Sequence, residues 1–146
     1  MRAIAKGQLV ALDTVVFIYA FERNERFGPA ATKVLERIHS GDLTAVVSTV
    51  VFAELLPPAF AASEPGNALA LKRQIDNYPN LSVRPVTNEI AFTAARLRAA
   101  YRLRTPDALH AATALQEGAA GLVTNDHRLS RLKAEGLKIW TFDDAT

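Results

Sequence analysis

The chain has 146 residues, of which 49% are hydrophobic and 22% are charged, and its formal net charge is +2. This composition excludes a disordered, collagen-like or low-complexity chain, and the length predicts a single domain over residues 1–146. The absence of cysteine excludes disulfides, zinc sites with cysteine ligands, iron–sulfur clusters and thiol catalysis. No uncharged stretch approaches the roughly 18 residues that cross a bilayer, and no secretory pattern is present, so we expect a soluble cytoplasmic protein.

The first half of the chain alternates short apolar runs with segments of helical spacing. An apolar run over Gln8–Leu12 predicts a buried strand, and Thr14–Phe21 predicts a helix because two of its aromatic residues lie four positions apart. A proline start and apolar residues at helical spacing predict the next helix over Pro29–Ser40. The β-branched Leu43–Ser48 predicts a second strand, and Thr49–Leu56 predicts a helix that the next two prolines break or kink.

The second half of the chain continues this alternation and ends in a strand. Its predicted elements are, in order, helix Asn67–Tyr78, strand Leu81–Pro85, helices Thr87–Tyr101 and Pro106–Glu117, strand Ala119–Thr124, helix His127–Ala134 and strand Leu137–Phe142. Strands separated by helices need crossover connections, and such connections produce parallel pairing. The alternation therefore predicts an α/β sandwich with a central parallel sheet flanked by helices.

Four carboxylates lie near the predicted strand ends. Asp13 directly follows the first strand, Glu54 lies on the helix that leaves the second strand, and Asp126 follows the fourth strand. Asp107 lies in the first turn of the helix that precedes the fourth strand. Ligands of open α/β sheets bind beyond the carboxyl ends of the strands, so we expect these four residues to converge in one cleft.

Each of the four acids also has a structural interpretation when it is considered alone. Asp13 is placed to cap the following helix, Asp107 to favour the dipole of its own helix, and Asp126 to form a turn. Glu54 lies among apolar neighbours, where an unpaired carboxylate is costly, but a helix position that faces solvent explains it equally well. The single residues therefore leave structural and functional roles open.

The combination of the four acids points to a bound cation. Carboxylates that converge in one cleft repel one another unless a cation compensates their charge, and an all-oxygen site suits Mg²⁺ or Mn²⁺. Such a cation supports phosphoester hydrolysis, because it lowers the pKa of a bound water and neutralises the charge that develops on the phosphate. The expected reaction is direct hydrolysis, without a covalent protein intermediate.

Four sequence blocks resemble a known family when they are taken together. They are LDTVVFIYAFE (Leu12–Glu22), STVVFAELL (Ser48–Leu56), RTPDALHAATAL (Arg104–Leu115) and LVTNDHRL (Leu122–Leu129). Each block is weak alone, but in this order and at this chain length they resemble the PIN-domain nucleases. Within that family they are most similar to the VapC-type toxins of bacterial and archaeal toxin–antitoxin pairs.

The resemblance implies a PIN-like three-layer sandwich around a parallel sheet of about five strands, in one nuclease domain. It implies that Asp13, Glu54, Asp107 and Asp126 form the family's catalytic, metal-binding quartet, with Asp13 and Asp107 binding the cation directly and the other two acting through water. It also implies an Mg²⁺- or Mn²⁺-dependent endoribonuclease that acts as a toxin on RNA. Such a toxin is often a homodimer and is neutralised by a cognate, VapB-like antitoxin.

Further candidates lie beside the quartet. Thr14, Thr124 and Asn125 are placed to hydrogen-bond the carboxylates or the scissile phosphate, although capping and turn formation explain them equally well. His110 lies about one helical turn after Asp107 and is a weaker candidate for the same cleft. A cluster of arginines before the third block either guides RNA phosphates or forms a solvated helix face, and it comprises Arg96, Arg98, Arg102 and Arg104.

Two other functions remain open from the sequence. A non-catalytic PIN-like module that binds RNA or a protein would keep the acids for structural reasons, and treatment with EDTA distinguishes it from a nuclease. A phosphoacceptor domain of the receiver type is disfavoured because it needs a pair of acids after the first strand, where Asp13 stands alone. The segment Leu55–Asn67 follows no recognised pattern, and we expect contacts with substrate or antitoxin there.

Overall fold

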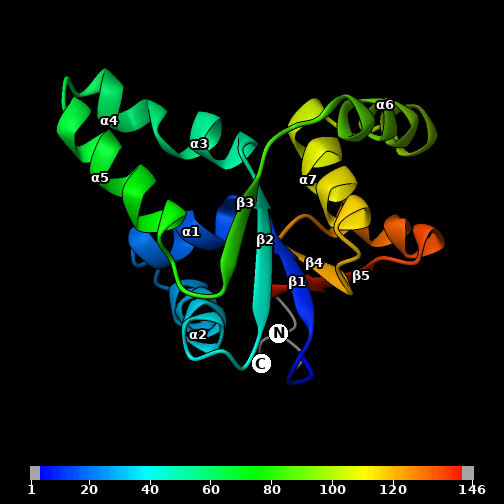
Figure 1. The fold of residues 1–146 in the computed structure, drawn as a ribbon, viewed down its shortest axis with the longest axis horizontal. Helices are drawn as coiled ribbons and strands as arrows, with labels where there is room; N and C mark the ends of the chain where they lie inside the picture. The colour runs from blue at the N-terminus through cyan, green and yellow to red at the C-terminus, as the bar shows by residue number, and fades with distance from the viewer. Residues whose placement is uncertain (1–3, 143–146) are drawn as a thin grey trace.

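The computed structural model describes residues 4–142 and places a five-stranded sheet at the centre of the molecule (Figure 1). All strands are parallel, in the order β3-β2-β1-β4-β5. Each strand is one or two residues shorter than its predicted run, and their bounds are β1 (Leu9–Leu12), β2 (Thr44–Ser48), β3 (Leu81–Arg84), β4 (Gly121–Thr124) and β5 (Lys138–Thr141). The predicted parallel sheet of five strands is therefore confirmed.

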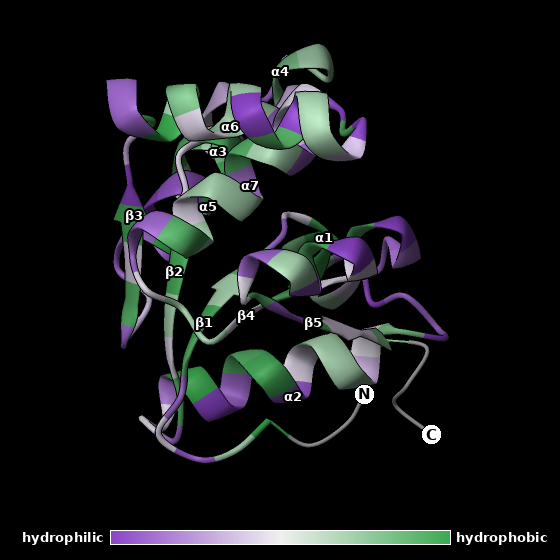
Figure 2. Ribbon diagram, turned by 90° about the vertical axis from the view of Figure 1, so that its right-hand side faces the viewer, coloured by the Kyte–Doolittle hydropathy of each residue, from purple (hydrophilic) through white to green (hydrophobic). Residues whose placement is uncertain are grey.

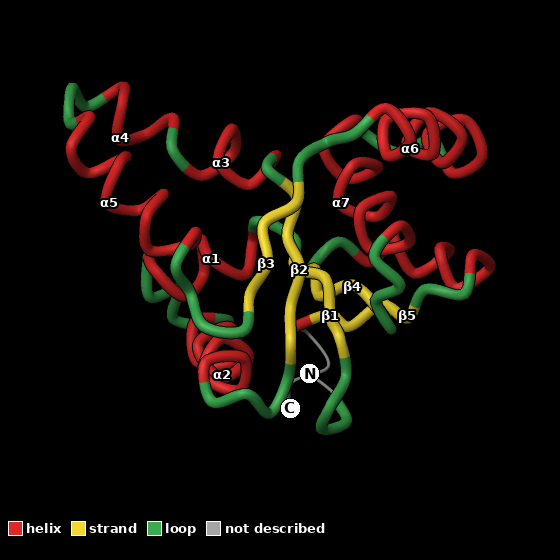
Figure 3. Tube along the Cα trace, viewed as in Figure 1, coloured by secondary structure: helices red, strands yellow, loops and turns green. Residues whose placement is uncertain are grey.

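Helices connect the strands and cover both faces of the sheet. Their bounds are α1 (Val15–Phe21), α2 (Gly28–His39), α3 (Val50–Leu55), α4 (Pro57–Ala61), α5 (Pro65–Asp76), α6 (Asn88–Tyr101), α7 (Thr105–Gln116) and the 3₁₀ helix η1 (His127–Glu135). Helices α1 and α2 lie on one side of the sheet, and α6 and α7 lie on the other (Figures 1 and 3). This arrangement is the predicted three-layer α/β sandwich.

The strands send alternate side chains into two hydrophobic cores. Val10 and Leu12 of β1 and Val123 of β4 pack in the core that contains α1 and α2. Ala11 of β1 and Leu122 of β4 pack in the core that contains α6, α7 and η1. Successive side chains of a strand point to opposite faces, so a sheet covered on both sides needs apolar residues at consecutive positions. Figure 2 shows this as the continuous hydrophobic colour of β1.

Helix α7 packs closely on the sheet because small side chains form its buried face. Ala108, Ala111, Ala112 and Ala114 are all fully buried in the second core. A methyl group in place of a larger side chain lets the helix backbone approach the strands. The first turn of α7, which carries Asp107, is thereby held near the carboxyl ends of the central strands.

The structure differs from the sequence prediction after β2. The two prolines at positions 57 and 58 end α3, as predicted, but they also begin an additional helix, α4. Helix α5 begins at Pro65, two residues before its predicted start. The reason is the same in both places, because proline is tolerated in the first turn of a helix, where its missing N–H has no partner to lose. Within residues 4–142, no helix is long and apolar enough to cross a membrane.

Gly121 tests how tightly the edge of the sheet is packed. A Cβ atom at this position would lie 2.5 Å from both the Lys138 carbonyl oxygen and the Trp140 ring on β5. We therefore expect Gly121→Ala to lower the free energy of unfolding by about 1–3 kcal/mol in urea denaturation, since an overpacked contact has no room to relax.

Gly66→Ala is the matched control for this change. A Cβ atom there meets open space in the first turn of α5, so stability should stay the same or rise by up to about 1 kcal/mol. A Gly121→Ala variant as stable as Gly66→Ala would contradict the packing of β5 on β4.

Candidate active site

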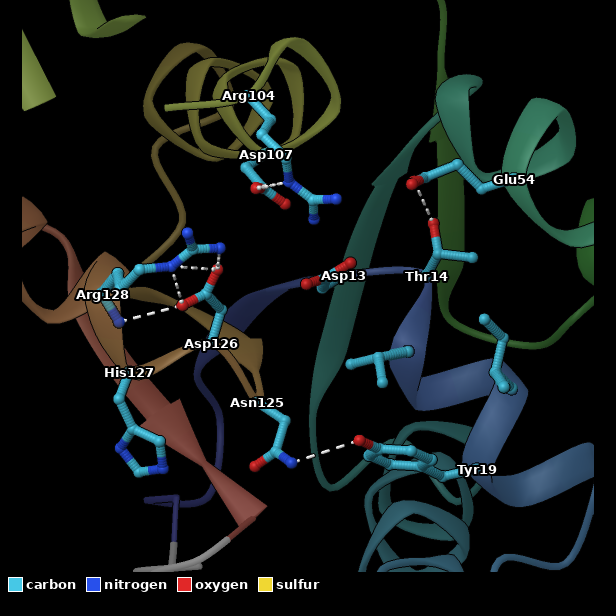
Figure 4. Close-up of a pocket in the computed structure, with 12 residues that line it drawn as sticks. Asp13, Thr14, Tyr19, Glu54, Arg104, Asp107, Asn125, Asp126, His127 and Arg128 are labelled. Carbon is cyan, nitrogen blue, oxygen red and sulfur yellow. Dashed lines mark hydrogen bonds and ion pairs between the residues drawn. The ribbon is translucent and has the colours of Figure 1, made fainter. Parts of the chain in front are cut away.

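A pocket of about 540 Å³ lies at the carboxyl ends of β1 and β4 and contains all four predicted acids (Figure 4). Its walls come from the β1–α1 junction, from α3, from the start of α7 and from the segment after β4. Two of the further candidates, Thr14 and Asn125, also line it. The sequence interpretation that the acids converge therefore agrees with the geometry.

Asp13 is held at the centre of the pocket by the two central strands. Its backbone N–H donates to the Val123 carbonyl at 2.9 Å, and its Oδ2 accepts from Thr124 Oγ1 at 2.7 Å. Helix α1 begins after Thr14 without any side-chain cap, so the alternative role of Asp13 as a helix cap is wrong. The Asp13 side chain, 15% exposed, faces the pocket instead.

Burial is the main influence on the charge of Asp13. It raises the pKa of this carboxyl above the ordinary value of 3.8, and the charges of Asp107 and Glu54 raise it further. His110 and the hydrogen bond from Thr124 act in the opposite direction without cancelling the effect. The ionised form of Asp13 therefore gains from a compensating positive charge.

Glu54 is linked to the opposite wall of the pocket through His110. Its Oε1 accepts from Thr14 Oγ1 at 2.7 Å and lies 2.7 Å from His110 Nε2. The hydrogen bond from His110 is the largest cause that lowers the pKa of Glu54 below its ordinary value. His110 Nε2 also lies 3.2 Å from Thr14 Oγ1 and 3.9 Å from Asp13 Oδ1. A single buried imidazole therefore connects Asp13, Thr14 and Glu54.

The contacts of His110 indicate which of its nitrogens carries the proton. An ionised Glu54 carboxylate can only accept, so Nε2 is the donor in the 2.7 Å bond. Nδ1 is buried without a partner among the described residues, which is tolerable for an acceptor but costly for an N–H. Nε2 is therefore the nitrogen through which His110 donates to Glu54.

His110 is the residue whose importance the sequence understates. Its spacing of three from Asp107 is the only local signal that it faces the cleft. Its partners Glu54 and Thr14 lie 56 and 96 positions away along the chain, and no local pattern reveals such contacts.

The other two acids are paired with arginines. Arg104 Nε donates to Asp107 Oδ2 at 3.1 Å within the first turn of α7, where Asp107 is 6% exposed. Asp126 accepts from the backbone N–H of Arg128 at 3.0 Å and from its guanidinium, with Nη2 at 2.7 Å. The side-chain hydrogen bond from Arg128 is the main cause that lowers the pKa of Asp126. Asp126 therefore combines the predicted turn role, at the start of η1, with a place in the pocket.

Thr124 and Asn125 support the pocket from β4. Thr124 Oγ1 donates to Asp13 and accepts from the backbone N–H of Asp126 at 3.2 Å, so one hydroxyl links two of the acids. Asn125 Nδ2 donates to the Tyr19 hydroxyl at 3.1 Å (Figure 4). Both residues act here by hydrogen bonding, and for Thr124 the partner is the Asp13 carboxylate itself.

Asp13 and Glu54 fit a divalent cation, and His110 Nε2 joins them as a ligand only in the tautomer that carries its proton on Nδ1. Their ligand atoms, two carboxylate oxygens and one imidazole nitrogen, all lie within 4.8 Å of one another. Two ligands that each lie about 2.0–2.1 Å from a shared Mg²⁺ are at most about 4.2 Å apart, so these atoms need to move together slightly to share one ion. Asp107 and Asp126 line the same pocket but lie outside this group of three.

The comparison with known families identifies the chain. Residues 10–135 match the family model of the PIN domain, and the chain belongs to the PIN-domain family. The family that the four sequence blocks resemble is therefore confirmed. No curated protein sequence matches the chain at a significant level.

Solved structures share its fold at low sequence identity. A chain of VapBC2 from Rickettsia felis, bound to a DNA fragment from its promoter, is 20% identical with a TM-score of 0.68, over 91% of this chain and 98% of that chain. VapC20 of Mycobacterium tuberculosis, a sarcin–ricin loop cleaving toxin, is 15% identical with a TM-score of 0.66, over 88% and 95%. A toxin–antitoxin complex from Klebsiella pneumoniae contains a chain 20% identical with a TM-score of 0.65, over 91% and 97%.

The raised pKa of Asp13 makes a testable statement about stability. A carboxyl that is more easily protonated in the folded state than in the unfolded state destabilises the fold once it ionises. Asp13→Asn removes that charge while its amide oxygen can still accept from Thr124. In EDTA at about pH 7, we expect the variant to have a higher midpoint of thermal unfolding than the wild type.

The pH dependence provides the control. The increase in the unfolding midpoint should shrink toward about pH 3, which is below the ordinary pKa of Asp, because Asp13 of the wild type is then protonated in both the folded and the unfolded state. Asp76→Asn, which removes an exposed partner of Lys72, should bring no such gain. A neutral-pH midpoint of Asp13→Asn at or below that of the wild type would refute the burial argument.

Proposed function

We propose that the protein is a metal-dependent endoribonuclease that acts as the toxin of a toxin–antitoxin pair. The observation that supports this most strongly is the convergence of Asp13, Glu54, Asp107 and Asp126, from four separate segments of a PIN-domain chain, in one pocket. Carboxylates gathered at the carboxyl edge of a parallel sheet suit a divalent cation and a phosphate-containing substrate. We assign these four acids as the catalytic residues, with Asp13 and Glu54 as the pair that would hold the metal.

The residues of the pocket have different roles in this proposal. Asp13 and Glu54 would hold the cation, Mg²⁺ or Mn²⁺, and His110 would orient Glu54 by its hydrogen bond, while Asp107 and Asp126 complete the acidic lining. When bound, the cation would activate water and offset the negative charge that builds up on the phosphate during hydrolysis. Thr124 fixes one oxygen of Asp13, and Thr14 fixes one oxygen of Glu54, so the free oxygens of both acids keep a set direction.

The substrate and partner follow from the same proposal. VapC20, which shares the fold, is a sarcin–ricin loop cleaving toxin, and the similar chain from Klebsiella pneumoniae comes from a toxin–antitoxin complex. We infer that this chain cleaves RNA in the cytoplasm, works as one nuclease domain over residues 1–146, pairs as a homodimer and is neutralised by a VapB-like antitoxin.

A non-catalytic PIN-like module that binds RNA or a protein is the alternative. The arginine pairing of Asp107 and Asp126 favours it, because these two acids already have structural partners. EDTA separates the two functions, since chelation stops a metal-dependent nuclease but leaves a binding module unaffected.

Neutral replacements of the acids test the catalytic assignment. We expect Asp13→Asn and Glu54→Gln each to reduce cleavage of RNA by about a hundredfold or more in the presence of Mn²⁺, because each removes a charge from the cation-holding group. Cleavage is measured on end-labelled RNA, and folding is checked by circular dichroism.

Asp76→Asn is again the matched control, and it should cleave RNA like the wild type. Full cleavage by both pocket variants, or cleavage by the wild type that persists in EDTA, would overturn the proposed function.

A further inference from the structure

The structure divides the arginines that the sequence places together. Arg96 Nη2 donates to Glu135 at 2.8 Å, and Arg98 Nε donates to the Leu103 carbonyl at 3.3 Å, so both serve the packing of α6. Arg102 ends α6 in a left-handed conformation, with φ of 55°. It lines a small recess with Arg104 and with two arginines of η1, Arg128 and Arg131.

This recess adjoins the acidic pocket and carries an excess of positive charge. Among residues 4–142, its lining contains four arginines and two acids, Asp107 and Asp126. Both acids, and both of the arginines paired with them, also line the main pocket. The recess is therefore a basic margin of the pocket, and we call its four arginines the arginine ridge.

The geometry points to the arginine ridge as the binding site for the phosphates of a single RNA strand that flank the cleaved bond. This inference rests on the proposed function and names the part of the site that holds the substrate. The Arg104 and Arg128 side chains are each 70% exposed although they are paired with acids. Arg104 uses Nε for Asp107, and its terminal nitrogens extend past that carboxylate into the pocket (Figure 4).

Three of the four ridge arginines, Arg104, Arg128 and Arg131, are also held in place before any ligand arrives. Asp126 accepts from both Nε and Nη2 of Arg128, and Arg131 Nη2 donates to the Tyr101 carbonyl. Ordering a long side chain on binding costs free energy, so arginines that are already oriented bind an anion at lower cost. Guanidinium groups suit phosphate because they offer paired N–H donors in a plane.

The wall opposite the ridge favours a nucleic acid over an acidic protein. Val15, Ile18 and Tyr19 of α1 form an apolar side of the same pocket. The Tyr19 ring is fixed by stacking on Phe27 at 5.1 Å and by an edge contact with Phe142 at 5.5 Å. A basic margin facing an aromatic wall is the combination that single-stranded nucleic acids use, with phosphates on one side and bases on the other.

The test removes the two ridge arginines that do not pair with the acids. Arg102→Asn suits the left-handed backbone, and Arg131→Gln keeps a donor for the Tyr101 carbonyl. The matched control is Arg23→Asn with Arg73→Gln, since Arg23 is also left-handed, with φ of 52°, and both lie outside the pocket.

Binding of a fluorescein-labelled single-stranded RNA is followed by anisotropy in EDTA over a series of KCl concentrations. For the ridge double variant, we expect about tenfold weaker binding and a salt slope that is lower by about 0.7 for each arginine removed. The control pair should keep the wild-type slope. An unchanged slope in the ridge variant, an equal loss in the control, or no binding of RNA by the wild type would overturn the inference.

Two further measurements distinguish this inference from binding of an acidic protein and from the proposed nuclease function. If the ridge variant loses affinity for a polyglutamate peptide but keeps its affinity for RNA, the ridge is a protein-binding surface and the inference fails. If the RNA slopes change as expected while the wild type does not cleave RNA with Mn²⁺, the ridge stands and the proposed nuclease function fails. If the wild type cleaves RNA but the salt slope of the ridge variant is unchanged, the ridge inference fails and the proposed nuclease function stands.

Discussion

Repulsion among four carboxylates in one pocket is the constraint around which the rest of the site is arranged. The parallel sheet makes the crowding unavoidable, because β1 and β4 are neighbours and both deliver an acid from their carboxyl ends. Each acid has its own donor to offset the cost, and the pairs are Thr124 with Asp13, His110 with Glu54, Arg104 with Asp107, and Arg128 with Asp126. The alanine face of α7 belongs to the same solution, since it lets the helix that carries His110 and Asp107 sit close to the strands.

These donors leave the pocket with two chemically different halves. In one half, threonine and histidine donors contact Asp13 and Glu54, whose pKa values move in opposite directions because Asp13 is buried whereas Glu54 accepts directly from His110. In the other half, guanidinium groups already neutralise Asp107 and Asp126. A cation therefore gains most in the first half, where the burial of Asp13 leaves a charge to be compensated, and an anion gains most in the second half.

The sequence predicts what depends on local pattern, and it misses what depends on contacts between distant segments. The five strands follow from apolar runs, and the gathering of the acids follows because Asp13 and Asp126 lie within two residues of the ends of two of those runs. Helix α4 is missed because proline both ends and begins helices, so the pattern alone does not say which it does. The central place of His110 and the separation of Arg96 from Arg104 are missed because the partners that decide them lie on other elements.

The net charge of +2 is the sum of two regions with opposite charge. With the four pocket acids set aside, 17 basic residues stand against 11 acidic ones, so the remainder of the chain carries +6. A polyanion is attracted to such a body at long range but is repelled by an uncompensated acidic pocket at short range. Arginines at the margin of the pocket reconcile the two, because phosphates can settle on them without approaching Asp13 or Glu54. On this view, charge determines where the strand binds. Its phosphates bind at the arginine margin, and its backbone can approach Asp13 and Glu54 only where a cation offsets the charge of the acids.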